Sequence, residues 1–211
     1  MGRARDRVGR RDEEQVSEPT STLTQSQQDR RERMLETTAQ LAHEGGWDAV
    51  QMREVAQRSD VALGTLYRYF PSKENLLVSV MIADIEGLAD RLAVRPPRGE
   101  DPVERVIDVL RRANRALQRE PQVTIAMIRA LVSGNSDIAP AVSETRVLMR
   151  RIISDALGVD GQVDAAGDDL IQSIDLLSDV WMAALVGWIS GVEPPAALVP
   201  KLEMATRVLL G

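Results

Sequence analysis

The sequence "QMREVAQRSDVALGTLYRYF", residues 51–70, carries the clearest structural pattern in the chain. Its first half predicts a short helix with one apolar face. Its second half predicts another, in which Leu66 and Phe70 share the inner face because they lie four residues apart. Only residues 59–61 separate the two helices. Two short helices joined by a turn of three to four residues form a helix-turn-helix, so the sequence predicts this motif at about residues 51–70.

The sequence before this motif predicts a polar arm followed by a longer helix. Residues 1–24 are rich in Arg, Asp, Glu, Ser and Thr and lack periodicity, which is typical of a disordered segment. A helix follows, with Thr24 or Ser26 as its N-cap and the pair Gly45 and Gly46 as its stop. One face of this helix carries the residues expected in the core: Met34, Leu35, Thr38, Leu41 and Ala42.

The sequence after the motif reads as helical to its end. Pro71 ends the second helix of the motif, and Ser72 caps a long fourth helix that stops at a break over residues 95–102. The remaining helices are expected at about 102–119, 121–133, 138–157, 167–190 and 195–210. No clean period-two run of β-branched residues appears. We therefore predict an all-α protein of about nine helices, with a first domain over residues 25–88 and a second over residues 89–211.

The composition excludes several classes of site. The chain has no cysteine and a single histidine, His43, which excludes disulfides, thiolate ligands, cysteine nucleophiles and multi-histidine metal sites. No phosphate-binding glycine loop appears in the sequence. We therefore predict no catalytic residues, no metal and no cofactor, and we interpret the chain as a protein that is not an enzyme.

The charge distribution restricts any contact with nucleic acid to a local patch in the first 80 residues. The net charge of −6 disfavours a protein that coats nucleic acid non-specifically. Residues 81–211 carry 14 basic but 19 acidic side chains. The charged N-terminus lacks the apolar centre of a secretory signal, and no run is expected to reach the roughly 18 apolar residues of a membrane span. We therefore expect a cytoplasmic protein without a membrane partner.

The second helix of the motif has an outer face suited to the DNA major groove, which admits one α-helix. With Leu66 and Phe70 turned inward, Gly64 and Arg68 face outward. Arg68 can present its guanidinium to guanine, and Gly64 lets the backbone approach closely. Arg53, in the first turn of the preceding helix, is a further candidate for a base or phosphate contact. The side chains that can donate to phosphates are Thr65, Tyr67, Tyr69 and Lys73.

The run "VQMREVAQRSDVALGTLYRYFPSKENLL", residues 50–77, resembles the N-terminal domain of TetR-family transcriptional regulators. The resemblance covers about 60 residues, 28–87, and includes the helix spacing. It implies that residues 25–88 bind a palindromic, double-stranded DNA operator as part of a homodimer, since one helix-turn-helix domain spans only half of such a site. It also implies that bases are read by Arg53, Leu63, Gly64 and Arg68, with Thr65, Tyr67, Tyr69 and Lys73 at the backbone-contact positions.

Three positions depart from the usual pattern of that family. Gln51 and Ala62 stand where Thr or Ser caps the two helices of the motif, and Asp60 stands where the turn has glycine. Aspartate tolerates a left-handed turn, whereas Gln and Ala are poor caps, and loss of a cap costs about 0.5–2 kcal/mol. We expect these departures to lower the local stability of the motif.

Three runs look like the KstR-type repressors of actinobacterial sterol catabolism: "VALGTLYRYFPSK", "ANRALQREPQVTIAMIRALV" and "LLSDVWMAALVGWIS". This resemblance extends over most of the chain. It implies a repressor of lipid or sterol catabolism that a hydrophobic effector, a sterol-derived or fatty acyl-CoA, releases from its operator. The alternatives are a TetR-type regulator of another pathway, such as efflux or the response to a small hydrophobic compound, and a DNA-binding dimer without an effector.

Residues 89–211 carry the groups that the resemblance assigns to ligand binding and dimerisation. In the family the middle helices enclose the effector, which implies a pocket that includes Met127, Leu131, Met149, Ile153 and Trp181. The last two helices form the family's dimer, which implies an interface that includes Leu177, Ala184, Leu185 and Trp188. Core packing is the alternative role for both groups, because a heptad-like stripe means burial against other helices. The helix predicted at 102–119 carries a run of basic residues that forms either a solvent-exposed face or an anchor for effector phosphates: Arg111, Arg112, Arg115 and Arg119.

Overall fold

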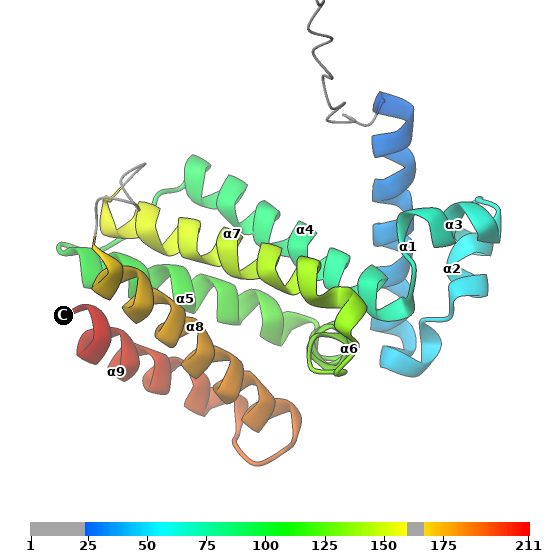
Figure 1. Cartoon of the computed structure of the whole chain (residues 1–211). Helices are drawn as coiled ribbons and strands as arrows, with labels where there is room; N and C mark the ends of the chain where they lie inside the picture. Colours follow the sequence, from blue (N-terminus) through cyan, green and yellow to red (C-terminus); the bar gives the residue numbers. More distant parts are fainter. Residues whose placement is uncertain (1–23, 160–166) are drawn as a thin grey trace, which may run out of the picture.

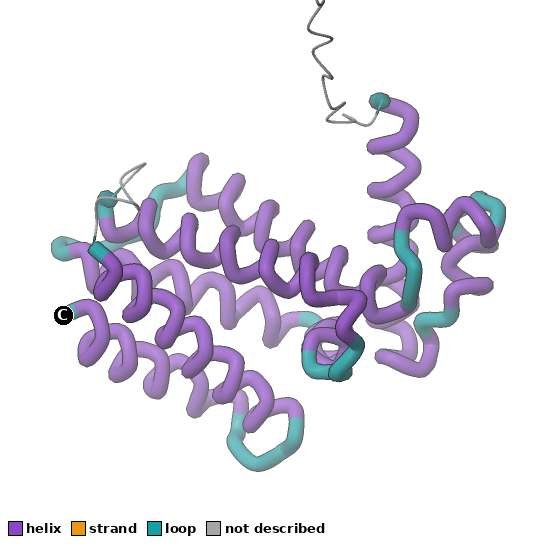
Figure 2. The backbone as a smooth tube through the Cα atoms, in the orientation of Figure 1, coloured by secondary structure: helices purple, strands orange, loops and turns teal. Residues whose placement is uncertain are grey.

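Nine α-helices and two short 3₁₀ helices make up the described part of the chain, residues 24–159 and 167–211, in this computed structural model (Figure 1). The helices are α1 Gln25–Ala49, α2 Met52–Arg58, α3 Leu63–Tyr69, α4 Lys73–Val94, α5 Pro102–Arg119, α6 Pro121–Leu131, η1 Ser136–Ile138, α7 Ala139–Leu157, α8 Asp168–Ile189, η2 Pro195–Ala197 and α9 Leu198–Leu210. Figure 2 shows no strand in these residues, so the all-α prediction is confirmed. Except for Thr24, the arm predicted over residues 1–24 lies outside the described residues.

The first helix begins where its cap was predicted but runs beyond its predicted stop. The Thr24 hydroxyl accepts a hydrogen bond from the Gln27 backbone N–H at 3.4 Å, and the Gln27 side chain accepts one from the Thr24 N–H at 2.8 Å. This capping box satisfies two amides that the helix leaves free. Gly45 and Gly46 depart from helical dihedrals and kink the chain, which then continues as one more turn to Ala49.

The helix-turn-helix forms as predicted from α2 and α3. Val55 on α2 and Leu66 on α3 are fully buried, and Phe70, directly after α3, is 2% exposed. Asp60 adopts the left-handed backbone conformation that glycine would occupy more easily, with φ of 53°. Neither Gln51 nor Ala62 makes a side-chain cap hydrogen bond, so both helices of the motif begin uncapped.

The missing cap on α3 leads to a stability prediction. Ala62 is exposed and has the extended backbone of an N-cap, so a serine hydroxyl there can accept from the first turn of α3. We expect Ala62→Ser to raise the free energy of unfolding by about 1 kcal/mol. Urea unfolding measures this change, with Ala62→Val as a control that adds bulk without an acceptor. Equal stability of the serine and valine variants would contradict the explanation.

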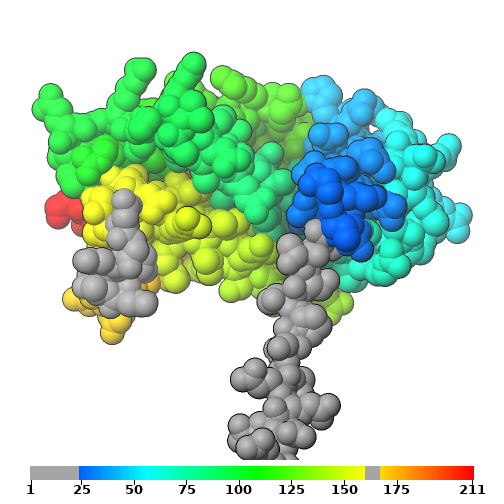
Figure 3. Space-filling model, turned by 90° about the horizontal axis from the view of Figure 1, so that it is seen from above, coloured from blue at the N-terminus to red at the C-terminus, as the bar shows by residue number. Residues whose placement is uncertain are grey.

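The fourth helix connects the motif to the rest of the molecule. The Ser72 hydroxyl accepts from the Asn75 N–H at 3.1 Å, as a cap should. Figure 1 shows α4 running from the α1–α3 unit into the body formed by α5–α9, and the predicted domain boundary at residue 88 falls inside this helix. In Figure 3, α1–α3, in blue and cyan, form a lobe at one end of the body. The hydrophobic core is continuous from α1 to α9.

The body consists of helices whose positions were close to those predicted. α5 has the predicted bounds, with Asp101 as its cap and Pro102 at its first position, and α6 ends two residues earlier than predicted, at Leu131. Short 3₁₀ turns precede both helices: η1 lies before the helix predicted at 138–157 except for Ile138, whereas η2 occupies the first three residues of the helix predicted at 195–210. α6 packs against α1 and α4, while α8 and α9 pack together along the outer side of the body (Figure 1).

One helix is more apolar than the sequence prediction allowed. Among the described residues, α8 is long and apolar enough to cross a membrane by length and composition alone, with a mean hydropathy of 1.4 in its 18-residue window. The expectation that no run approaches this length was therefore wrong. Only 28% of that window is buried in the protomer. The buried face of α8 packs into the body through Ile174, Leu177 and Trp181.

Candidate nucleic-acid interface and effector cavity

The outer face of α3 presents most of the predicted DNA-contacting residues together. Gly64 and Arg68 are exposed, and Tyr67 is 46% exposed. A Cβ atom added at Gly64 would meet nothing within 4 Å, so no contact inside the protomer requires glycine at this position. Leu63 and Thr65 are half-buried at the start of the same helix. This surface can approach a groove without rearrangement of the core.

The three neighbouring aromatic side chains occupy different environments. Phe70 belongs to the core, and the Arg31 guanidinium of α1 lies 5.8 Å from the centroid of its ring. Tyr69 is half-buried, with its ring centroid 6.2 Å from that of Phe70 and 6.0 Å from the Arg68 guanidinium carbon. Tyr67 points away from the core. The two tyrosines therefore differ in exposure, which the sequence pattern did not indicate.

Arg53 and Lys73 differ in how free their charges are. Arg53 is exposed in the first turn of α2. The Lys73 ammonium donates a hydrogen bond to the Trp47 carbonyl oxygen and lies 4.2 Å from the centroid of the Trp47 ring. Burial lowers the pKa of Lys73 below its usual value, while the charge of Asp48 opposes that shift. A phosphate contact by Lys73, which stays a prediction, would require the ammonium to leave this position.

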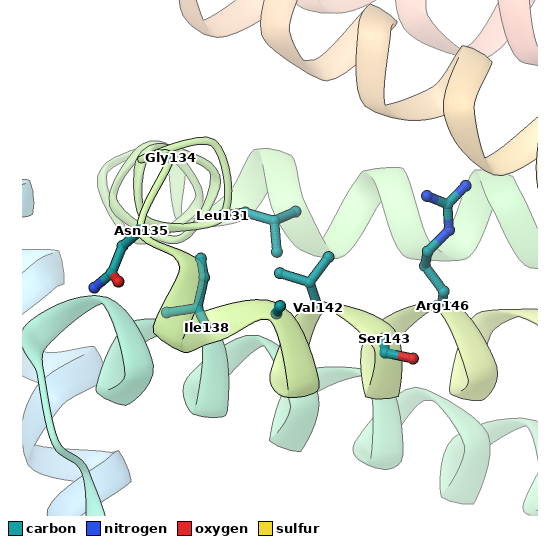
Figure 4. A pocket seen from close by; sticks show the side chains of 8 residues that line it. Leu131, Gly134, Asn135, Ile138, Val142, Ser143 and Arg146 are labelled. Carbon is teal, nitrogen blue, oxygen red and sulfur yellow. The ribbon is translucent and has the colours of Figure 1, made fainter.

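An open cavity lies where the end of α6 meets η1 and the start of α7 (Figure 4). Its volume is about 430 Å³. Figure 4 shows the apolar side chains of Leu131, Ile138 and Val142 around it, with Arg146 one turn further along α7. The complete lining consists of Leu131, Gly134, Asn135, Ile138, Ala139, Val142, Ser143 and Arg146. The cavity is therefore apolar at one end and carries a guanidinium at the other.

Of the five residues predicted for the effector pocket, only Leu131 lines this cavity. The structure places the other four in the core: Met127, Met149, Ile153 and Trp181. The Trp181 indole N–H donates to the Asn114 side-chain oxygen at 3.1 Å, and the Asn114 amide donates to the Leu110 carbonyl at 2.9 Å. Sequence reasoning missed Asn114, although a lone amide on the apolar face of residues 102–119 was a signal that could have found it.

Three of the four residues predicted for the dimer interface are buried within the protomer. Leu177, Ala184 and Leu185 are each less than 5% exposed, and Trp188 is half-buried. Their side chains therefore pack against their own chain in this structure. The exposed apolar side chains of α8 and α9 are instead Leu176, Met204 and Val208, at 50%, 71% and 77% exposure. The heptad-like stripe read from the sequence selected the side of α8 that packs on the body and left these three side chains out.

The basic run on α5 is mostly engaged in contacts with the protein itself. Arg111 donates to the Glu203 carboxylate of α9 at 2.7 Å. Arg112 binds Asp108 at 2.6 Å and donates to the carbonyls of the loop before α5. Arg115 donates to the Arg111 carbonyl at 3.3 Å, while Arg119 is exposed. These contacts favour a structural role for the run over an anchor for phosphates.

Within residues 24–159 and 167–211, no group of three or more His, Asp or Glu side chains could hold a metal ion. His43 contacts the Glu120 carboxylate at the junction of α1 with the body, and both side chains are more than half exposed. The histidine therefore makes a surface contact with a carboxylate.

Comparison with known proteins identifies relatives of both parts of the chain. Residues 34–80 match the family described as bacterial regulatory proteins, tetR family, and residues 99–209 match the tetracyclin repressor-like C-terminal domain. The HTH-type transcriptional repressor KstR of Rhodococcus jostii is 39% identical over 186 residues, which span 88% of this chain and 85% of that protein.

Solved structures agree with this relationship. The crystal structure of a TetR transcriptional regulator from Rhodococcus sp. RHA1 has a TM-score of 0.80 and 33% identity, covering 88% of this chain and 97% of that one. Thermus thermophilus FadR, a TetR-family repressor solved in complex with lauroyl-CoA, has a TM-score of 0.67 and 24% identity, covering 85% of this chain and 93% of that one.

Proposed function

The chain belongs to the TetR family of bacterial transcriptional regulators, and we propose that it is a dimeric repressor that a hydrophobic effector releases from a palindromic DNA operator. The observation that carries this proposal is the outer face of α3, where Gly64, Tyr67 and Arg68 are exposed together on a helix that packs on the core through Leu66. Such a helix fits the major groove, where a guanidinium can distinguish guanine from the other bases.

Each residue of this surface has a proposed task. Arg68 reads a base edge, and the open space beside Gly64 allows DNA to approach the backbone. Arg53 supports the reading from α2. The proposed phosphate contacts hold the helix in register and come from Thr65, Tyr67, Tyr69 and Lys73, with Leu63 as an apolar contact at the helix start.

The exposed apolar faces of α8 and α9 support dimerisation. Leu176, Val180 and Ala183 lie at spacings of four and three residues, so they form one stripe along the outside of α8. Met204 and Val208, four residues apart, extend it on α9. An apolar surface of this kind on a soluble regulator indicates an interface. We call these five residues the α8–α9 stripe and propose that a second copy covers it, with Trp188 at its edge.

The open cavity supports an effector with an apolar tail and an anionic group. Its volume lies within the usual range for ligand sites, about 300–1,000 Å³, and Arg146 stands at its polar end. Arg146 pairs with Asp179 at 2.6 Å, and a phosphate of coenzyme A could replace that carboxylate. We propose a fatty or sterol-derived acyl-CoA as effector and lipid or sterol catabolism as the pathway, by analogy with the lauroyl-CoA complex of FadR and with KstR.

The effector proposal leads to a prediction for Arg146. We expect Arg146→Gln to weaken binding of lauroyl-CoA about 10- to 150-fold, because a charge-assisted hydrogen bond contributes about 1.5–3 kcal/mol. Isothermal titration calorimetry measures the affinity, with Arg151→Gln as the control, since Arg151 is an exposed arginine on the same helix but outside the cavity lining. If both variants bind lauroyl-CoA as tightly as the natural chain, Arg146 does not bind the anionic group.

We favour an effector-controlled DNA-binding regulator over two alternatives, a dimer without an effector and an enzyme. A dimer without an effector would not need the cavity at the α6–α7 junction. An enzymatic role finds no support in the curated relative, which is a transcriptional repressor. Binding of an operator places the protein in the cytoplasm.

Selection of DNA from a random duplex pool tests the proposed function directly. We expect the purified protein to enrich one palindrome with two half-sites spaced by about one helical turn or a multiple of it. Enrichment of no sequence above the starting pool would contradict operator recognition.

A further inference from the structure

Trp47 lies at a junction where cations from two parts of the molecule contact one ring. The Lys73 ammonium, at the first residue of α4, is 4.2 Å from the ring centroid, and the Arg129 guanidinium carbon, on α6, is 4.7 Å from it. Lys73 also donates a hydrogen bond to the Trp47 carbonyl oxygen. The ring and the backbone of one residue thus hold the start of α4 and one turn of α6 at the same time.

The backbone around Trp47 is fitted to α6 as well. Gly46, which precedes it, is buried and has φ of 63°, and a Cβ atom there would lie 2.8 Å from the Gln122 side-chain oxygen. His43, one turn earlier, contacts Glu120 directly before α6. The last turns of α1 therefore pack along the first half of α6, and the positive φ at position 46 favours glycine there.

The two cations around Trp47 repel each other, so their arrangement depends on the ring. A cation over an aromatic face gains about 0.5–2 kcal/mol, and the tryptophan ring is the strongest acceptor. Among the charges that act on the pKa of Lys73, that of Arg129 lowers it. If Arg129 moved away from the ring, the attraction of Lys73 to the ring and its repulsion by Arg129 would both change.

The two cations at Trp47 connect it to the proposed effector cavity on one side and to the proposed DNA-contacting helix α3 on the other. Arg129 is two residues before Leu131, which lines the open cavity, and both lie on the last turn of α6. Lys73 begins α4 four residues after Tyr69, the last residue of α3. A displacement of the last turn of α6 would therefore move Arg129 relative to Trp47 and change how strongly the ring holds Lys73, whose ammonium must leave the ring to reach a phosphate.

We infer that Trp47, Arg129 and Lys73 form a coupling element, in which the contact of Arg129 with Trp47 transmits the position of α6 to the reading helix α3. This inference rests on the proposed DNA-binding function. Arg129 acts here as a positioning residue that touches neither DNA nor effector. Because coupling between sites is reciprocal, binding of DNA at α3 must also change the stability of α6.

Hydrogen–deuterium exchange with and without DNA tests the coupling without requiring an effector. The probe is the duplex that the natural chain selects from a random pool. We expect this duplex to slow amide exchange in residues 121–131 about 2- to 30-fold, which corresponds to a coupling of about 0.5–2 kcal/mol, in addition to protection of α3. The expected effect on α6 disappears in Arg129→Gln and in Trp47→Leu, whereas protection of α3 persists.

Two further variants separate coupling from folding. Arg129→Lys keeps a cation at the ring and should retain most of the protection of α6, while Arg119→Gln removes an exposed arginine of the body and should retain all of it. Protection of α6 that is unchanged in Arg129→Gln would overturn the inference, as would a natural chain in which the duplex protects α3 but not α6. If the natural chain binds no duplex, the proposed function fails, and the coupling fails with it.

Discussion

Met204→Arg should raise the dissociation constant of the dimer at least about 100-fold and abolish operator binding at concentrations where the natural chain is saturated. Met204 is 71% exposed in the protomer and lies in the α8–α9 stripe. An arginine there stands between Lys201 and Arg207 on the same face of α9, so no neighbour on its own helix neutralises it. An unpaired charge buried by a partner costs about 3–5 kcal/mol.

Analytical ultracentrifugation measures the dimer, and fluorescence anisotropy with the selected duplex measures operator binding. Val94→Arg is the matched control, because Val94 is 81% exposed at the end of α4 and lies outside the stripe. The control adds the same charge and should leave both measurements unchanged. A Met204→Arg protein that remains dimeric would show that the partner covers another surface.

Arg68→Ala should relax the preference for one base pair in each half-site. A guanidinium that makes two hydrogen bonds to guanine contributes about 1–3 kcal/mol of discrimination, and a dimer makes that contact twice. The removal of the side chain should therefore reduce the difference in affinity between the selected operator and single-base variants about 5- to 150-fold per half-site. Competition binding against a panel of single-base variants at one fixed salt concentration measures this difference.

Tyr67→Phe is the informative comparison for Arg68→Ala. It removes one exposed hydroxyl and keeps the ring, so it should weaken binding to all sequences alike if that hydroxyl contacts a phosphate. Tyr69→Phe should act in the same way, with a smaller loss where its half-buried position limits access to DNA. If Arg68→Ala also lowers affinity equally for every sequence, Arg68 contacts the DNA backbone.

Local signals predicted the helices well because their ends are determined by neighbouring residues. The Ser72 and Asp101 side chains accept hydrogen bonds from backbone N–H groups three residues ahead and so cap α4 and α5. A cap of this kind is indicated by the residue type and its position before a helical pattern. The motif likewise follows from spacing, since Leu66 and Phe70 are both buried as expected. The left-handed conformation at Asp60 fits the prediction that aspartate replaces the usual glycine there.

Contacts between distant parts of the chain could not be predicted in this way. Leu176 and Leu177 are neighbours with the same chemistry, yet one is 50% exposed and the other is fully buried, because only the position of α8 in the body distinguishes them. Asn114 bonds to Trp181, which lies 67 residues further along. Lys73 was expected at a phosphate because it begins a helix, whereas the structure turns it toward Trp47, 26 residues earlier.

Titration of the protein–DNA complex with acyl-CoA shows whether an effector controls the binding of DNA. The complex of the dimer with its selected, fluorescently labelled palindrome is titrated with lauroyl-CoA and with a sterol-derived acyl-CoA. We predict that the anisotropy falls to that of free DNA with at least one of them, while free coenzyme A has no effect. Anisotropy that stays constant with both ligands would show that neither acyl-CoA releases the protein from its operator.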